Sequence, residues 1–146
     1  MRKMIFLLMS LVSVILIAGC IISPQTPITG DLSVELKIHD SLPKSLTLQK
    51  DGTLIFTEGD KTDQISLSSE EVESLKQIII DNNFFTLKEK YEDRNLMDGI
   101  GHTITITIGD ESHSVYCYGE CPEGFSNVLG KIKSLWTQEI QYSGFA

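Results

Sequence analysis

Positive charge is sparse in this chain of 146 residues, which has 12 Lys and Arg against 20 Asp and Glu and a formal net charge of -8. No run of basic residues occurs after residue 3. Sequence-independent binding of nucleic acid requires clustered Lys and Arg to displace counterions from the phosphates. The composition therefore argues against nucleic acid as a partner, and the length leaves room for one ordinary domain only.

The sequence also lacks the short motifs that mark common catalytic sites. It contains no G-x-S-x-G, no H-E-x-x-H and no phosphate-binding P-loop. An acidic segment over residues 89–98 lacks the residue order of a calcium loop, and cations interrupt it. Its carboxylates are those of Glu89, Glu92, Asp93 and Asp98. We interpret this segment as a solvated loop, and we predict a protein that is not an enzyme and holds no cofactor.

Hydrophobic residues concentrate at the N-terminus. Arg2 and Lys3 precede an apolar run over residues 4–17, and small residues then lead to Cys20. A run of about 14 residues is shorter than the roughly 20 that cross a bilayer. These features predict a secretory signal peptide over residues 1–19. An uncleaved signal anchor or a buried N-terminal helix is the alternative.

The segment Ile17-Ala18-Gly19-Cys20 resembles the lipobox of prokaryotic lipoproteins. The resemblance implies that Cys20 becomes the acylated N-terminus, with palmitate among its chains, and that the protein is held at the cell membrane on the extracytoplasmic face. Each buried methylene contributes about 0.8 kcal/mol, so two or three chains anchor firmly. Residues 20–30 contain Pro24 and Pro27 and are predicted to be a flexible tether. Cleavage removes two cations, which gives the mature chain a charge of 10 - 20 = -10.

The remaining residues, 31–146, show the two periodicities of a single α+β domain. Strict alternation of apolar and polar residues predicts a half-buried strand over residues 31–38. Three more strands are predicted over residues 46–49, 53–57 and 63–67, with Asp51-Gly52 and Gly59-Asp60 in the turns. A later hairpin is predicted from residues 103–108 and 112–118.

Two helices complete the predicted domain. Ser68 and Glu71 match a capping box at the start of the first helix, which ends near Asn82-Asn83. Pro122 suits the first turn of the second helix, although Gly124 and Gly130 each weaken it by up to about 1 kcal/mol. The apolar stripe of that helix is formed by Phe125, Val128, Leu129, Ile132, Leu135 and Trp136. We therefore predict an antiparallel sheet with both helices on one face, in the order β-β-β-β-α-β-β-α.

Two cysteines remain once Cys20 is acylated. Export favours a disulfide between Cys117 and Cys121, and a turn containing Gly119 brings their Cα atoms within reach. Two free thiols are the first alternative. A thiol-redox role is another, because Cys121 lies near a helix N-terminus, where a thiolate is favoured.

A metal-dependent role of the same cysteines requires further ligands, and the candidates are His113 and His102. On an ideal strand, however, His113 lies about 13 Å from Cys117, too far for one ion. His39 and His102 resemble ordinary strand-end residues.

Tyr116, Tyr118 and Trp136 are candidates for an exposed aromatic patch, with Trp136 better placed for the core. The disulfide is the interpretation that the spacing favours.

The order of three segments resembles a family of uncharacterised prokaryotic exported domains that occur largely in lipoproteins. The segments are LTLQKDGTLIF, LSSEEVESLKQIIIDNNFFTLKEKY and DGIGHTITITIGDESHSVYCYGECPEGFSNVLGKI. The resemblance covers roughly residues 34–136 and implies no activity and no site. The Cys-rich segment C-F-G-x-C-P of some relatives is missing here. We expect a binding or envelope accessory domain with an unknown protein or small-molecule partner; a thiol-redox or metal-dependent protein is the alternative.

Overall fold

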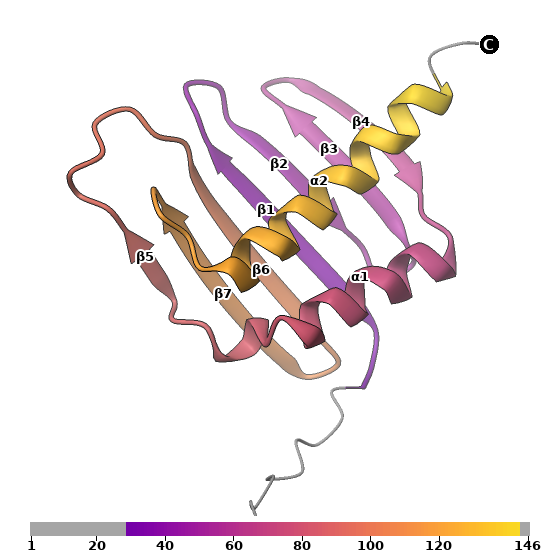
Figure 1. Cartoon of the computed structure of the whole chain (residues 1–146). Coiled ribbons are helices and arrows are strands. Elements are labelled where there is room, and N and C mark those ends of the chain that lie inside the picture. The colour runs from indigo at the N-terminus through magenta and orange to yellow at the C-terminus, as the bar shows by residue number, and fades with distance from the viewer. Residues whose placement is uncertain (1–28, 144–146) are drawn as a thin grey trace, which may run out of the picture.

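Four strands open the part of the chain that the computed structural model describes, residues 29–143 (Figure 1). They are β1 (Leu32–His39), β2 (Lys44–Leu48), β3 (Thr53–Glu58) and β4 (Lys61–Ser66), and each pairs antiparallel with the next. Their bounds lie within two residues of the periodicity in the sequence. The predicted signal peptide, Cys20 and the predicted tether up to residue 28 lie outside the described residues.

Helix α1 (Ser69–Asp81) begins with the capping box that the sequence predicts. The Ser68 hydroxyl accepts a hydrogen bond from the Glu71 backbone N–H at 3.3 Å, and the Glu71 carboxylate accepts one from the Ser68 N–H at 2.8 Å. These two bonds satisfy N–H groups that no helical carbonyl reaches. After α1, Asn83 adopts a left-handed backbone with φ 50°, and the short 3₁₀ helix η1 (Phe84–Thr86) buries Phe84.

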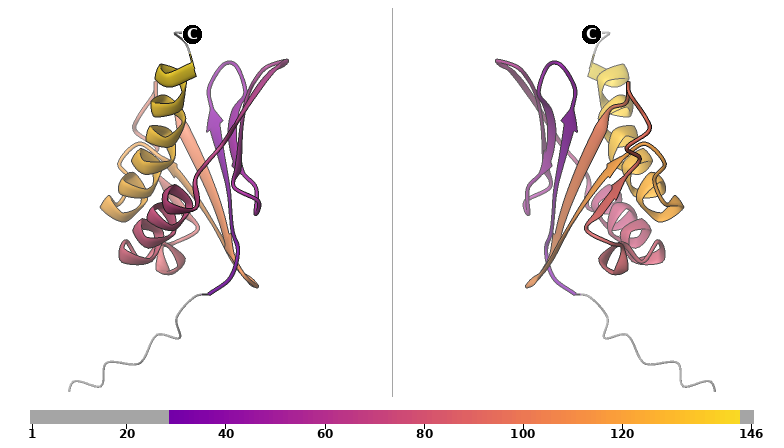
Figure 2. Two further views of the ribbon diagram at one scale, coloured as in Figure 1. Left: turned by 90° about the vertical axis from the view of Figure 1, so that its right-hand side faces the viewer. Right: turned by 90° about the vertical axis from the view of Figure 1, so that its left-hand side faces the viewer.

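The second half of the domain consists of β5 (Lys90–Glu92), β6 (Gly101–Ile108), β7 (Glu111–Tyr118) and α2 (Glu123–Ser143). Strand β6 pairs antiparallel with β7 and also with β1, so the sheet order is β4-β3-β2-β1-β6-β7-β5. Helix α1 therefore carries the chain from the β4 edge of the sheet towards the β5 edge. The α+β class and the presence of both helices on one face agree with the prediction (Figures 1 and 2).

Strand β5 corrects the prediction that residues 89–98 form a solvated loop. It runs parallel to β7, with Lys90 opposite Tyr116 and Glu92 opposite Tyr118. The Tyr116 N–H donates to the Glu89 carbonyl at 2.8 Å, and the Asp93 N–H donates to the Tyr118 carbonyl at 2.9 Å. Three residues are too few to display the alternation of a strand. Residues 90–92 form a strand because β7 supplies the backbone hydrogen bonds. The sheet is consequently mixed and not purely antiparallel.

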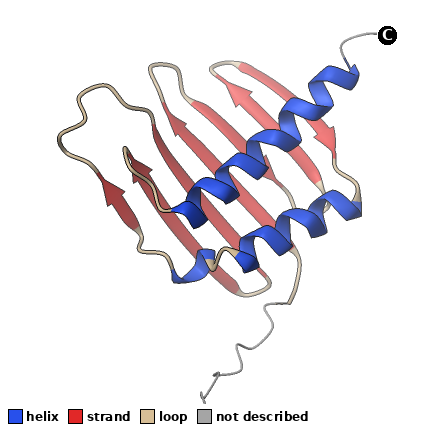
Figure 3. Cartoon of the chain, in the orientation of Figure 1, coloured by secondary structure: helices blue, strands red, loops and turns tan. Residues whose placement is uncertain are grey.

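The core lies between the sheet and the two helices, which cover the same face (Figures 2 and 3). Among the described residues, every fully buried side chain that forms it is apolar or belongs to Cys117. Trp136 is partly buried and its ring lies 4.8 Å from that of Phe56, centroid to centroid, in agreement with the core position expected for it. Gly124 lets α2 approach the end of α1, because a Cβ there would lie 2.7 Å from the Asn82 carbonyl oxygen.

Candidate functional site: the open face of the sheet

Within residues 29–143, no helix lies on one face of the seven-stranded sheet, which we call the open face (Figures 2 and 3). The strand register places on this open face the residues that alternate with the buried core positions. Most of them have hydroxyl groups: Ser33, Ser45, Thr47, Thr53, Thr57, Thr62, Ser66, Thr103, Thr105, Thr107, Ser112, Ser114, Tyr116 and Tyr118. The others are Glu35, Lys37, His39, Ile55, Gln64, Lys90 and Glu92.

The charges of the open face cancel in pairs. Lys37 Nζ lies 3.0 Å from a Glu35 oxygen, and Lys90 Nζ lies 2.8 Å from a Glu92 oxygen. The Lys90 ammonium lowers the pKa of Glu92, chiefly through this hydrogen bond. The open face is therefore electrically neutral, although the chain as a whole has a net charge of -8.

The hydroxyl groups on neighbouring strands contact each other in cross-strand pairs. The Thr105 and Ser114 hydroxyl oxygens lie 2.9 Å apart, and the Thr107 hydroxyl donates to Ser112 at 3.0 Å. Each hydroxyl has one hydrogen and two lone pairs, so a pair of this kind leaves acceptor capacity unused. The surface can therefore form further hydrogen bonds with a ligand along β6 and β7.

Aromatic residues gather at one end of the open face, where β1, β6, β7 and β5 lie side by side. His39 Nε2 is 2.8 Å from the Thr103 hydroxyl oxygen, and the His39 ring meets the Tyr116 ring edge to face at 5.6 Å. Lys90 Nζ lies 5.7 Å from the centre of the Tyr116 ring, in the range of a cation–π contact. The register of the sheet brings these four residues together from four strands.

Both tyrosines of this end lie across glycines. A Cβ on Gly101 would meet the Tyr116 hydroxyl oxygen at 3.0 Å and its Cε2 at 3.1 Å, and a Cβ on Gly99 would meet Tyr118 Cε2 at 2.9 Å. The Tyr118 hydroxyl also donates to the Leu96 carbonyl at 3.0 Å and accepts from the Gly99 N–H at 3.2 Å. We call Tyr116 and Tyr118, with Gly101 and Gly99 beneath them, the tyrosine platform.

In the sequence alone, Gly99-Ile100-Gly101 has the composition of a turn, and nothing local relates it to the tyrosines. The relation could have been found from the two-residue turn at Gly109-Asp110, because that turn fixes the register of the β6–β7 hairpin. In this register Thr103 is opposite Tyr116, which places Gly101 on the diagonal from Tyr116. The glycines at 99 and 101 and the tyrosines at 116 and 118 are both two residues apart. This equal spacing is the sequence pattern that indicates two tyrosines facing two glycines.

Exposed apolar side chains adjoin the tyrosine platform. In the β5–β6 loop, Leu96 is 41% exposed, Met97 is 92% exposed and Ile100 is 49% exposed. This loop lies at the end of the sheet away from the point where the described chain begins (Figure 1). The β1–β2 connection at the same end carries Leu42, which is 46% exposed. These four exposed apolar side chains thus lie at the end of the domain opposite residue 29, where the described chain begins.

The two cysteines lie on the covered side of the sheet. Cys117 and Cys121 are joined as a disulfide with Cα atoms 5.8 Å apart, which ties the end of β7 to the start of α2. Cys117 is fully buried. A thiol-redox reaction requires a partner to reach a sulfur atom, and only Cys121 is partly exposed.

The three histidines are held apart. His113 Nε2 is 2.8 Å from the Leu87 carbonyl oxygen, against the phenylalanines of η1. His102 lies opposite Cys117 on the covered face, and its Nε2 is 3.0 Å from Lys133 Nζ. Burial and, to a lesser degree, the Lys133 charge lower the pKa of His102. His39 lies on the open face. Within residues 29–143, no group of three or more His, Cys, Asp or Glu side chains is arranged to hold a metal ion.

The acidic segment is likewise divided among local contacts. Glu92 contacts Lys90 and also Arg94, whose Nε is 3.7 Å away, while the Asp93 carboxylate accepts from the Asn95 N–H at 2.9 Å. Glu89 contributes its backbone carbonyl to β7. The Glu92 and Asp93 carboxylates and the Glu89 carbonyl thus stabilise the β5 edge and the turn after it.

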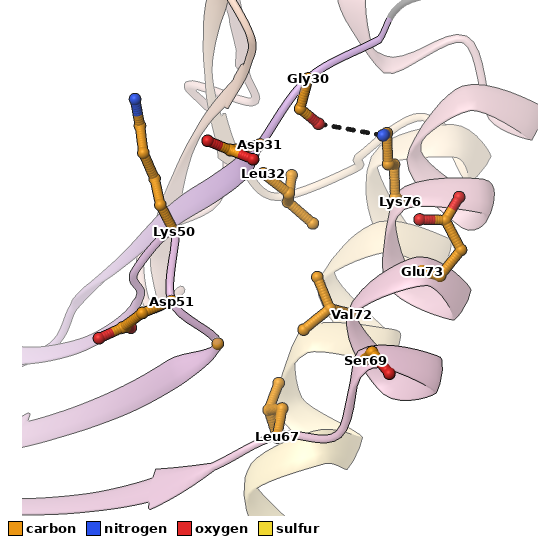
Figure 4. A pocket seen from close by; sticks show the side chains of 11 residues that line it. Gly30, Asp31, Leu32, Lys50, Asp51, Leu67, Ser69, Val72, Glu73 and Lys76 are labelled. Carbon is orange, nitrogen blue, oxygen red and sulfur yellow. Dashed lines mark hydrogen bonds between the residues drawn. The ribbon is translucent and has the colours of Figure 1, made fainter.

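A cavity of about 320 Å³ lies between the start of β1, the β2–β3 turn and α1 (Figure 4). Its rim carries Asp31, Asp51, Glu73, Lys50 and Lys76, and Lys76 Nζ donates to the Gly30 carbonyl at 3.0 Å. All five of these charged side chains are exposed or partly exposed. The cavity lies at the end where the described chain begins, far from the tyrosine platform in Figure 1.

The sequence comparisons assign no relative to this chain. No protein-family model matches it, and no curated protein matches it in sequence. Within residues 29–143, no helix combines the length and the apolar character needed to cross a membrane. The open face and its tyrosine platform are therefore described from their own geometry.

Proposed function

We propose that this protein is a lipid-anchored, extracytoplasmic binding module and that the open face of the sheet is its binding surface. The observation that carries the proposal is the asymmetry of the sheet: in the described part of the chain both helices cover one face, and no helix covers the neutral, hydroxyl-rich face (Figure 2). The leader and Cys20 supply the anchoring part of the proposal, which rests on their resemblance to a lipoprotein signal.

The position of the tyrosine platform relative to the start of the described chain supports this proposal. The described chain begins beside the β6–β7 turn, whereas the tyrosine platform and the exposed Met97 lie at the opposite end (Figure 1). A domain tethered through residues 20–30 would present this opposite end away from the membrane. Exposed apolar groups beside a polar surface are typical of interaction sites.

Crosslinking followed by mass spectrometry in the native host tests the binding surface. Thr105→Glu places a charge in the middle of the open face, and Ser74→Glu places the same charge on the exposed side of α1. We expect Thr105→Glu to lose the crosslinked partners and Ser74→Glu to retain them. Partners lost with Ser74→Glu and kept with Thr105→Glu would contradict the proposed surface.

The anchor has its own test. We expect Cys20→Ala to prevent incorporation of labelled palmitate and to release the protein from the membrane fraction. Cys121→Ala, which replaces a cysteine outside the predicted leader, is the matched control and should leave labelling unchanged. If Cys20→Ala left the protein processed and anchored as before, lipidation would be disproved.

A further inference from the structure

The tyrosine platform restricts the chemistry of a ligand more closely than the open face as a whole. Tyr116 and Tyr118 occupy successive same-face positions of β7, about 7 Å apart along the strand. The edges of both rings lie close to glycines, and both side chains are partly exposed. An aromatic face carries negative partial charge and attracts C–H groups that are partly positive.

The groups around the rings are neutral donors and acceptors. Thr103 is directly opposite Tyr116 on β6, and His39 contacts both of them. From Thr103 the hydroxyl row continues along β6 through Thr105 and Thr107. A ligand that contacts the platform and the row must therefore combine apolar C–H faces with many hydroxyl groups, and it needs no charge.

We infer that the tyrosine platform and the hydroxyl row of β6 bind an uncharged, extended glycan. This inference rests on the proposed function of the open face. Pyranose rings have C–H groups on their faces and hydroxyl groups at their edges, which matches aromatic faces bordered by threonines. The neutrality of the open face, within a chain of net charge -8, suits an uncharged polymer better than a polyanion or a polycation.

The arrangement of the hydroxyl row along β6 favours one type of glycosidic linkage in the ligand. Thr103, Thr105 and Thr107 occupy every second position of one strand of eight residues, so a ligand that contacts all three must be extended along that strand. A β-1,4-linked glycan is an extended ribbon whose successive rings present their faces and edges regularly. An α-1,4-linked glycan coils away from such a row. We therefore expect β-1,4 linkage to be preferred.

Lys90 is the group that competes for the platform. Its ammonium lies 5.7 Å from the centre of the Tyr116 ring and is paired with Glu92. The side chain of Lys90 is 58% exposed, and an exposed ion pair of this kind is weak because solvent screens it. A sugar ring can displace it. Removal of Lys90 should therefore strengthen glycan binding, an effect that a merely structural role of Tyr116 would not produce.

Calorimetric titration of the full chain in detergent micelles tests the inference. The probes are cellohexaose and the hexamer of β-1,4-linked N-acetylglucosamine, with maltohexaose as the coiled control and polygalacturonate as the charged control. We expect at least one β-1,4 hexamer to bind saturably and at least tenfold more tightly than either control. Equal binding of maltohexaose, or tighter binding of polygalacturonate, overturns the inference.

Three variants connect binding to the platform. Tyr116→Ala should weaken binding at least tenfold, Tyr116→Phe should keep it within about threefold because the ring remains, and Lys90→Ala should tighten it. Thr62→Ala, on the far strand β4 of the same face, is the matched control and should change nothing. If Tyr116→Ala fails to fold, the inference still stands or falls on Lys90→Ala, which should tighten binding, while Thr62→Ala should leave binding unchanged.

The outcomes separate the glycan from the proposed function. If no glycan binds but Thr105→Glu loses a crosslinked protein, the glycan inference fails and the open face remains a binding surface. Self-association of the full chain through the platform, abolished by Tyr116→Ala, also overturns the glycan. If no glycan binds and Thr105→Glu retains every crosslink, both proposals fail.

Discussion

The ring of Tyr116 lies across Gly101, so closely that a Cβ at position 101 would stand 3.0 Å from the Tyr116 hydroxyl oxygen. Gly101 is not among the glycines with positive φ, so its backbone conformation does not require glycine. The requirement comes from the ring. A glycine within a strand is otherwise unfavourable, and an aromatic side chain laid over it restores packing.

Gly101→Ala should therefore destabilise the fold by about 1 to 3 kcal/mol, because the new methyl group forces the Tyr116 ring upwards. Urea unfolding followed by circular dichroism measures the change. In a Tyr116→Ala background the same substitution should cost less or become stabilising, which a double-mutant cycle detects. An equal cost in both backgrounds would show that the ring is not the reason for the glycine.

The two glycines of α2 should respond in opposite directions to alanine. Gly130 has no atom within 4 Å of a Cβ built on it, so Gly130→Ala should stabilise the protein by about 0.5 to 1 kcal/mol. Gly124→Ala should destabilise it, because the Asn82 carbonyl oxygen stands 2.7 Å from the new Cβ. Thermal unfolding of both variants beside the wild type checks the pair. Stabilisation by both would contradict the close contact between α1 and α2.

Acidification should reduce stability through His102. Burial first, then the charge of Lys133, hold the pKa of His102 below its ordinary value of 6.5, while the Ile100 carbonyl opposes the shift and His39 adds slightly to it. The unfolded chain therefore takes up this proton at a higher pH than the folded domain does. The contribution of neutral His102 to the free energy of unfolding is therefore complete above the pKa that His102 has in the unfolded chain. It falls as the pH drops from that value through the lower pKa of His102 in the folded domain.

Urea unfolding between about pH 8 and about pH 5 measures this contribution. His102→Gln should show a flatter pH profile over that interval than the wild type. Glu71, whose pKa the Ser68 backbone N–H lowers, loses its contribution at more acidic pH, below its ordinary value of 4.5. Glu71→Gln should therefore change the slope of the acidic limb only, because it removes the carboxylate that titrates there. Identical profiles for the wild type and His102→Gln would refute the assignment.

The Cys117–Cys121 disulfide is expected to be a local clamp. Cys121→Ser should cost about 2 kcal/mol, since the closed loop is short and its entropy in the unfolded chain is small. Alkylation mass spectrometry on the exported protein should find both cysteines oxidised and resistant to mild reductant, because Cys117 is fully buried. Ready reduction and reoxidation of the pair would favour the thiol-redox alternative.

Local signals made most of the fold predictable. Alternation in β1, β6 and β7, the Ser68–Glu71 capping box and the apolar stripe of α2 all lie within a few residues, so neighbouring residues were enough to indicate each element. The predicted bounds of β2 and β4 differ from the observed ones by one or two residues, because strand ends depend on the partner strand.

By itself, the sequence determined the strands with a period, the capped helix, the α+β class and the excess of negative charge. Only the tertiary structure decided that β6 pairs with β1, that residues 90–92 form a strand along β7, and that two glycines lie under two tyrosines. These relationships join residues distant in the chain, and no local period encodes them. The neutral open face arises from the same long-range pairing, which sets polar residues of seven strands side by side and leaves the remaining acidic residues in the helices, the turns and the rims of the sheet.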